Sequence, residues 1–191
     1  NGPENAAIHY RSSGETVKYV KRDLAPFGEY IPLRTLAEKI SPLARNVVDF
    51  QPGKVRQIFR VKTGQFTPLI CFELLDDQVF TESASESNFL VSMTNNATFG
   101  KSSEAAQQFL IARVRAYEMR KEAAVVSTTG YTGFINSKGG VTLQADQFKS
   151  IALSKEITLH NCRTPISKHR SAPEFAVIVI FAITFMRRKN E

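Results

Sequence analysis

One segment with a clear helical period divides the short β-prone runs of this sequence into two groups. This order constrains the fold more than any other feature. Within residues 103–121, apolar side chains recur at spacings of four, four and three, which places them on one face of a helix. They are Ala106, Leu110, Val114 and Tyr117. Strands on both sides of one strong helix predict an α/β domain in which at least one face of the sheet is covered.

The ends of this segment carry residues that favour helix termini. Ser102 or Ser103 can cap the first turn, and Glu104 places a carboxylate where the helix dipole favours one. Lys121 would place a cation in the last turn, where the dipole favours positive charge. The sequence therefore predicts a helix with both ends specified.

The β-prone runs supply the rest of the fold. Residues 1–20 predict a hairpin that turns at 12–15, and a short helix is expected at 33–40. Further strands are expected at 56–62, 66–72, 89–93, 123–127, 132–135 and 140–144.

The composition is that of a globular protein with an excess of basic residues. Of the 191 residues, 42% are apolar and 23% are charged, which is enough to bury a core. A formal net charge of +7 could attract nucleic acid or an anionic membrane surface. The basic residues form no stripe with interleaved aromatics, so we expect no nucleic-acid partner. The sequence contains no metal-binding, phosphate-loop or nucleotide motif, and we expect no cofactor and no metal.

The C-terminus carries an apolar run of twelve residues, 175–186, which is closed by a basic tail at 187–191. A membrane span needs about 17–25 residues, so a buried helix or strand also fits this length. Three consecutive cations after the run instead resemble the cytoplasmic end of a span. We expect a transmembrane helix here.

Cys71 lies near the end of the apolar run at 66–72 and poses the main functional question. A cysteine among apolar residues often simply packs in a core. Glu73 follows two positions later and would share its face of a strand, where a carboxylate needs a partner or a function. Sites in α/β folds also gather where strands end. Cys71 is therefore a candidate nucleophile, and a purely structural role stays open.

A cysteine nucleophile needs a base, or a cation that stabilises its thiolate. The three histidines lie in no recognisable cysteine–histidine motif; they are His9, His160 and His169. Residues 21–30 offer Lys21 and Glu29 instead. Phe27 and Tyr30 flank the glycine and the glutamate of this segment, which suggests that the loop packs inward and brings the carboxylate with it.

Taken in order, the motifs of this chain resemble the nitrilase, or carbon–nitrogen hydrolase, superfamily, and within it the apolipoprotein N-acyltransferases of bacterial envelopes. The resemblance covers the chain from residue 5 to the end. It rests on "KRDLAPFGEYIPLR" from Lys21, "ICFE" around Cys71, "TNNATFGKSSEAAQQFLIARVRAYE" from Thr94, "TTGYTGFINSKGGV" from Thr128, and "RTP" at 163–165.

The resemblance implies a nitrilase-like α/β sandwich, incomplete at its N-terminal side, followed by the apolar helix at the C-terminus. It divides the chain into three parts. Residues 1–165 would form the C-terminal part of a carbon–nitrogen hydrolase domain, 166–174 a linker, and 175–191 a membrane segment with a basic tail.

The resemblance also implies roles for individual residues. Cys71 matches the nucleophile, and Lys21 matches the lysine that helps to hold the thiolate and the oxyanion. Glu29 matches a second carboxylate that orders the site, and Glu73 matches the glutamate after the nucleophile. The backbone N–H of Phe72 would join the lysine in the oxyanion hole.

The implied activity is transfer of an acyl chain from a phospholipid, through a cysteine thioester, to the N-terminal amine of an apolipoprotein. The expected partners are thus a phospholipid acyl donor, an apolipoprotein acceptor and the membrane. The implied location is the bacterial cytoplasmic membrane, with the catalytic domain on the extracytoplasmic side. A Cys71–Cys162 bridge would block the nucleophile, so we expect both thiols to be unpaired.

This chain departs from the family's pattern at several positions. Phe72 replaces a tyrosine, Asn96 an aspartate and Thr98 a tryptophan, while Thr128 and Thr129 stand where asparagines are common. Two other functions therefore stay open. One is a soluble nitrilase-like amidase that acts on a small amide, and the other is a non-catalytic membrane-anchored domain.

The family's triad includes a glutamate well upstream of the lysine, in a "PE" motif after a strand. The "PE" pair before Lys21 contains Glu4, which lies too close to that lysine to fit. We therefore expect the general base to be absent from these 191 residues, and we expect this chain alone to be inactive.

Overall fold

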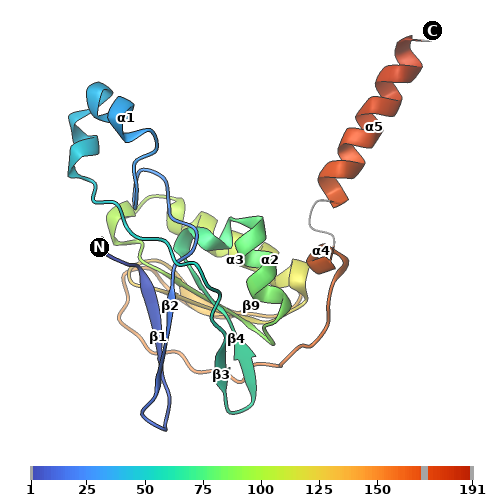
Figure 1. The fold of residues 1–191 in the computed structure, drawn as a ribbon. Helices are drawn as coiled ribbons and strands as arrows, with labels where there is room; N and C mark the ends of the chain where they lie inside the picture. Colours follow the sequence, from blue (N-terminus) through green and yellow to red (C-terminus); the bar gives the residue numbers. More distant parts are fainter. Residues whose placement is uncertain (1, 169–171, 190–191) are drawn as a thin grey trace.

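The computed structural model describes residues 2–168 and 172–189. A five-stranded sheet forms its centre (Figure 1). Its strand order is β5-β6-β7-β8-β9. The first three strands are parallel, and β8 and β9 extend the sheet with antiparallel pairing. The strands are β5 (Pro68–Ile70), β6 (Leu90–Thr94), β7 (Ala123–Ser127), β8 (Thr132–Ile135) and β9 (Val141–Ala145). The strands predicted at 89–93, 123–127, 132–135 and 140–144 are thus confirmed within one residue.

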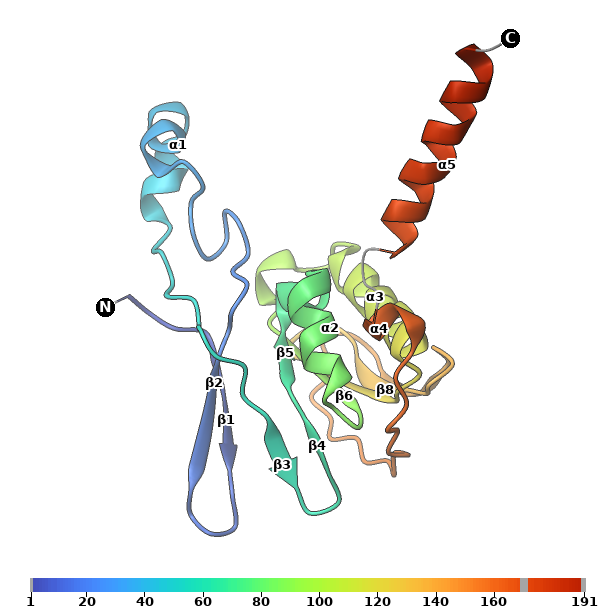
Figure 2. The same cartoon turned by 45° about the vertical axis from the view of Figure 1, so that its right-hand side comes forward.

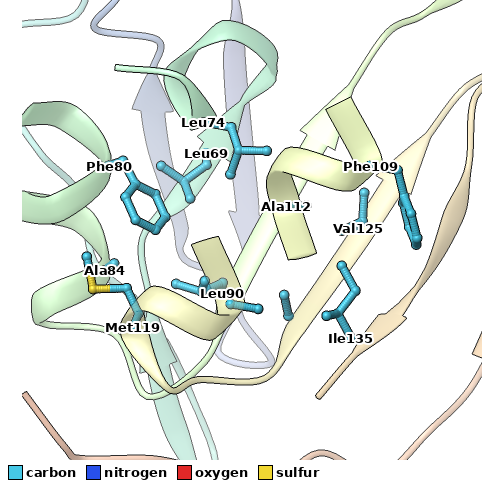
Figure 3. Close-up of a cluster of buried hydrophobic side chains, with 12 residues drawn as sticks. Leu69, Leu74, Phe80, Ala84, Leu90, Phe109, Ala112, Met119, Val125 and Ile135 are labelled. Atoms are coloured by element: carbon cyan, nitrogen blue, oxygen red, sulfur yellow. The ribbon is translucent and has the colours of Figure 1, made fainter. Parts of the chain in front are cut away.

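Two helices make the crossovers between the parallel strands and cover the same face of the sheet. Helix α2 (Asp77–Ser85) connects β5 to β6, and α3 (Glu104–Met119) connects β6 to β7 (Figure 2). Their side chains meet those of the strands in one hydrophobic core (Figure 3). This core includes Leu69, Phe80, Leu90, Phe109, Met119, Val125 and Ile135. The short 3₁₀ helix η3 (Ala97–Phe99) precedes α3.

The helix predicted at 103–121 is confirmed as α3, but the predicted face is not the buried one. Leu110, Val114 and Tyr117 are each about half exposed. The face against the sheet carries Ala105, Phe109, Ala112, Ala116 and Met119. Its small alanines let the helix approach the strands closely, and a count of large apolar side chains does not detect such a face. At the start, Ser103 takes the N-cap position without a side-chain cap bond, and Ser102 Oγ instead accepts the N–H of the first helical residue.

Lys121 was predicted to lie in the last turn of α3, and this prediction is wrong. The helix ends at Met119, and Arg120 takes a left-handed conformation that turns the chain away. Lys121 is buried beyond the helix, and its Nζ donates to the backbone carbonyls of Ala84 and Ser87 at the end of α2. Burial lowers the pKa of this lysine. Its cation thus stabilises the C-terminus of α2 instead of that of α3.

Two hairpins precede the sheet. The first, predicted at 1–20, is confirmed, and the second is formed by a shorter strand than the one predicted at 56–62. Their strands are β1 (Ala6–Tyr10), β2 (Thr16–Val20), β3 (Phe59–Val61) and β4 (Gly64–Phe66). Tyr19, Phe59 and Ile70 form a second hydrophobic cluster, so both hairpins pack against the end of β5.

The single strand predicted at 66–72 is wrong. Strand β4 ends at Phe66, β5 begins two residues later, and the 3₁₀ helix η2 (Cys71–Leu74) follows β5 directly. Cys71 and Glu73 therefore do not share a strand face. Instead, Cys71 is half-buried, whereas the side chain of Glu73 is fully buried.

The helix predicted at 33–40 is confirmed as α1 (Arg34–Ile40). It is followed by the 3₁₀ helix η1 (Pro42–Asn46). Together they form a lobe that stands away from the sheet in both views (Figure 1 and Figure 2). The guanidinium of Arg34 stabilises the lobe because it donates to the carbonyl of Val47 and to the carboxylate of Asp49.

The C-terminal part contains α4 (Pro165–Lys168) and α5 (Ala172–Lys189). Within residues 2–168 and 172–189, no helix is both long enough and apolar enough to cross a membrane. The transmembrane helix predicted at 175–186 therefore stays a prediction. Asn190 and Glu191 of the predicted tail, and His169, lie outside the described residues.

The core between α2 and the sheet predicts a large effect of truncation at Phe80. Its ring is 0% exposed, and the Arg115 guanidinium lies 4.5 Å from the ring centroid. We expect F80A to lower the free energy of unfolding by about 3–5 kcal/mol, because it leaves a cavity. Urea unfolding followed by circular dichroism measures this. The matched control F148A removes a ring that is 49% exposed and should cost less than about 1 kcal/mol. Equal losses in the two variants would refute this view of the core.

Candidate active site

The carboxyl ends of the three parallel strands meet at one edge of the sheet. Cys71 follows β5, Asn95 follows β6 and Thr128 follows β7. Ligand sites of α/β sheets form outside this edge. The structure thus places Cys71 where a site is expected, although the residue begins a 3₁₀ turn and does not belong to the strand.

A cavity of about 640 Å³ opens at this edge. Its walls combine the end of the sheet with the first hairpin and the loop after it. Lining residues are Asn5, Ala6, Ala7, Lys21, Ala25, Gly28, Glu29, Phe50, Ile70, Cys71, Met93, Thr94, Asn95, Thr98, Val126, Ser127 and Thr128. Three residues that the sequence singled out, Cys71, Lys21 and Glu29, therefore share one cavity.

The backbone at Cys71 is unusual. Its φ of 51° lies in the left-handed region, which a residue with a Cβ rarely adopts. Such conformations cluster at active sites, because the surrounding structure must hold them in place. The turn presents the thiol of Cys71 to the cavity, and the backbone N–H of Phe72 follows it directly. Phe72 itself is half-buried.

Lys21 lies directly after β2 and is 1% exposed. Its Nζ donates to Glu29 Oε2 at 2.5 Å. Glu29 is held by two further donors, the Ala25 N–H at 2.8 Å and the Asn5 amide at 2.7 Å. The buried ammonium thus has its counter-ion within the cavity, as a buried charge requires. The loop brings the carboxylate of Glu29 into the cavity, as predicted, but the ring of Phe27 stays 67% exposed.

The pKa of Glu29 is lowered in this environment. Burial alone would raise this pKa, but the hydrogen bonds from Lys21, from Ala25 and from Asn5 outweigh burial. Of the cavity-lining residues that the structure describes, Glu29 alone carries a carboxylate. A carboxylate held ionised by three donors orients the lysine well and accepts a proton poorly.

Glu73 ties the first hairpin to the turn at Cys71. Its Oε1 accepts from the Tyr19 hydroxyl at 2.5 Å and from the Arg22 N–H at 2.6 Å. Its Oε2 accepts from the Ile70 N–H at 2.8 Å. Burial raises the pKa of Glu73, and these hydrogen bonds counteract only part of that rise. Glu73 therefore binds the hairpin side of the site and the β5 side at once, and it does not line the cavity.

Gln108 is a site residue that sequence reasoning missed. Its Nε2 donates to Cys71 Sγ at 3.4 Å from the first half of α3. No periodicity signals this contact, because glutamine is common on helix surfaces and the contact spans 37 positions. Asn5, which holds Glu29, gave no signal either.

Other candidates lie outside the site. His9 packs on the ring of Phe59, and Glu4 pairs with Lys18 on the surface. Both cysteines are free, as expected, and Cys162 is exposed. In the described part of the chain, no group of three His, Cys, Asp or Glu side chains is arranged to hold a metal ion.

No model of a known protein family matches the sequence. Curated relatives do match it. An apolipoprotein N-acyltransferase of Haemophilus influenzae is 31% identical over 180 residues, which cover 90% of this chain and 34% of the relative. One of Pasteurella multocida is 32% identical over 153 residues, which cover 78% of this chain and 29% of the relative. The chain thus spans about a third of the length of the curated relatives it matches.

Solved structures show the same fold at lower identity. A CN-hydrolase superfamily protein of Xanthomonas campestris has a TM-score of 0.57 and 14% identity, and the match covers 93% of this chain and 63% of that chain. A member of the nitrilase superfamily from Saccharomyces cerevisiae has a TM-score of 0.54 and 17% identity, and the match covers 89% and 58%. At such identities the comparison concerns the fold alone.

The Lys21–Glu29 pair predicts a pH-dependent stability. Replacing Glu29 by glutamine leaves a buried ammonium without its carboxylate, so E29Q should lose roughly 3 kcal/mol of unfolding free energy at neutral pH. Because folding lowers the pKa of Glu29 below its ordinary 4.5, the ionised form stabilises the protein fully above that value. This contribution is lost as pH falls through the lowered pKa.

Urea unfolding between about pH 6 and about pH 3 tests this prediction, and the difference between wild type and E29Q should shrink towards acid. The control is E15Q, because Glu15 forms an exposed ion pair with Arg11. That variant should cost less than about 1 kcal/mol. A wild-type–E29Q difference that stays constant over the pH range would contradict the assignment.

Proposed function

We propose that this chain, a homologue of apolipoprotein N-acyltransferases with the fold of the CN-hydrolase superfamily, carries the nucleophilic cysteine of such a transferase. The reaction moves an acyl chain from a phospholipid to the N-terminal amine of an apolipoprotein. One observation carries the proposal: Cys71, Lys21 and Glu29 line the same cavity. Because the chain spans about a third of its relatives, the activity is proposed for the full-length protein.

The first half of the reaction forms a thioester. The thiolate of Cys71 attacks the carbonyl carbon of a phospholipid ester, and the carbonyl oxygen becomes an oxyanion. Collapse of this intermediate breaks the ester C–O bond, and a proton goes to the departing lysophospholipid oxygen. Covalent catalysis of this kind divides one difficult transfer into two easier steps.

The second half transfers the acyl chain. The amine attacks the thioester carbon, the C–S bond breaks, and its electron pair returns to Cys71 Sγ. The amine loses a proton, so the products are an amide and the regenerated cysteine. Apolar walls at Ala7, Phe50, Met93 and Val126 suit the acyl chain during both halves.

The surrounding groups have separate tasks in this proposal. Lys21 and the Phe72 N–H stabilise the oxyanion, because positively polarised donors act strongly in a site shielded from water. Glu29 orients the lysine through their hydrogen-bonded ion pair. Since Glu29 is engaged by three donors and no other described lining residue carries a carboxylate, we propose that the rest of the full-length protein supplies the general base. This chain alone is therefore expected to be inactive.

Exposed apolar surfaces support a location at the membrane. In the lobe of α1 and η1, a cavity of about 330 Å³ is lined by apolar side chains that include Phe27, Ile40 and Leu43. On α5, Val177, Ile178 and Phe181 are more than half exposed. We propose that both surfaces contact the cytoplasmic membrane from its extracytoplasmic side, with 175–191 as the membrane segment.

The proposal predicts a trapped acyl-enzyme. Full-length protein incubated with phospholipid, without an acceptor, should carry one acyl chain on the peptide that contains Cys71. Mass spectrometry before and after neutral hydroxylamine detects it, because hydroxylamine cleaves a thioester. The variant C162S should keep the adduct and C71S should lose it.

Acylation of apolipoprotein by C71S would reject Cys71 as the nucleophile. Hydrolysis of a small amide with no acyl adduct from phospholipid would instead indicate an amidase.

A further inference from the structure

A network of polar side chains behind the nucleophile connects Cys71 to α3, to β6 and to β7. Gln108 Nε2 donates to Cys71 Sγ at 3.4 Å, and Gln108 Oε1 accepts from Thr94 Oγ1 at 2.9 Å and from Asn96 Nδ2 at 3.0 Å. Gln108 thus lies between the sulfur and the polar groups at the end of β6. Thr94 and Asn96 saturate the oxygen of its amide, which leaves the nitrogen for the sulfur.

The orientation of both amides follows from Glu104. A carboxylate only accepts hydrogen bonds, so Asn96 must turn its Nδ2 towards Glu104 Oε2, at 2.6 Å. The second hydrogen of Nδ2 then reaches Gln108 Oε1, and the Gln108 nitrogen must face Cys71. Glu104 and Gln108 are four apart in α3 and so lie on one helical face.

The other end of the network matches this direction. The Gly130 N–H donates to Ser127 Oγ at 2.8 Å, and Ser127 Oγ donates to Asn96 Oδ1 at 2.6 Å. Asn96 is 2% exposed, and these contacts occupy its oxygen as well as its nitrogen. A Cβ at position 130 would lie 2.5 Å from Asn96 Oδ1, so only glycine leaves room for the network. The Asn96 amide is therefore held at both ends, and the Glu104 carboxylate alone decides which way it points.

We infer that Gln108 is a catalytic residue whose amide N–H stabilises the thiolate of Cys71, and that Glu104, through Asn96, is a positioning residue for it. A hydrogen bond to a charged acceptor is stronger than one to a neutral acceptor, so the contact favours the thiolate over the thiol. The inference deepens the proposed function and rests on it, because a thiolate occurs twice in that reaction. It attacks the ester in the first half, and it leaves the carbon in the second.

Other charged groups around the sulfur are the same in the wild type and in a variant changed at Gln108. Lys21 and Glu29 line the cavity, and Glu73 lies two residues on in the turn and faces the backbone of Ile70. None of them is altered by substitution at Gln108. A change in thiol reactivity on substitution therefore reports on the amide.

Alkylation by iodoacetamide tests the inference without phospholipid. In full-length protein, the second-order rate constant at Cys71 is measured by mass spectrometry at about pH 7 and about pH 10. We expect Q108L to react about tenfold more slowly at the lower pH, because it removes a hydrogen bond to a charged group. At the higher pH the thiol ionises without help, so the rates should agree within about twofold.

The chain supplies matched controls. The adjacent Q107L changes an exposed glutamine and should react like wild type, and exposed Cys162 is an internal reference in every variant. If Q108L does not fold, E104Q tests the network instead. Its side chain can donate, so it releases the orientation of Asn96 and should slow alkylation about threefold at neutral pH.

The following outcomes would overturn the inference. They are a wild-type rate in both Q108L and E104Q, an equal loss at both pH values, or a loss shared by Q107L or by Cys162. Failure of the proposed function is distinguishable, because phospholipid would then leave no acyl adduct on Cys71 while the effect of Q108L on alkylation persisted.

Discussion

The buried carboxylate of Glu73 is the contact on which the site depends. It accepts from the Tyr19 hydroxyl and the Arg22 N–H on one side, and from the Ile70 N–H on the other. Lys21 lies between the first two residues, and Cys71 directly follows the third. One side chain therefore fixes the cation relative to the nucleophile. A buried carboxylate is costly unless it is hydrogen-bonded, and here the donors that offset this cost come from the two parts that must be joined.

Three glutamates around Cys71 have different tasks because their partners differ. Glu29 faces the cavity and is paired with Lys21, Glu73 holds backbone groups and faces away, and Glu104 orients an amide network behind the sulfur. In the described residues, each of the three is thus already engaged by donors. The arrangement suits a site that prepares a thiolate and an oxyanion hole, and it leaves proton transfer to another group.

The sequence predicted the order of the elements well, because turn residues and apolar runs are local signals. It predicted the hairpin at 1–20 and the strands β6 to β9 of the sheet, and the family resemblance predicted that Lys21 and Glu29 act together with Cys71. The predictions from sequence failed where contacts between distant residues determine the local structure. The strand at 66–72 breaks because Phe66 pairs with β3 while Ile70 pairs with β6. The 3₁₀ helix η2 then begins at Cys71, whose backbone is left-handed. The buried face of α3 was missed because alanines form it, and Gln108 was missed because its partner lies 37 positions away.

The central claim is that the Glu73 carboxylate joins the lysine side of the site to the cysteine side, and hydrogen exchange in E73Q tests it most directly. Glutamine has one oxygen where the carboxylate has two, so it can serve either the Ile70 N–H or the Arg22 N–H, but not both. Peptides that cover 19–23 and 68–72 report on the two sides. The account predicts that at least one of them exchanges about tenfold faster than in wild type, while the amides of β6 and β7 keep their protection. Wild-type protection of both peptides in E73Q would contradict it.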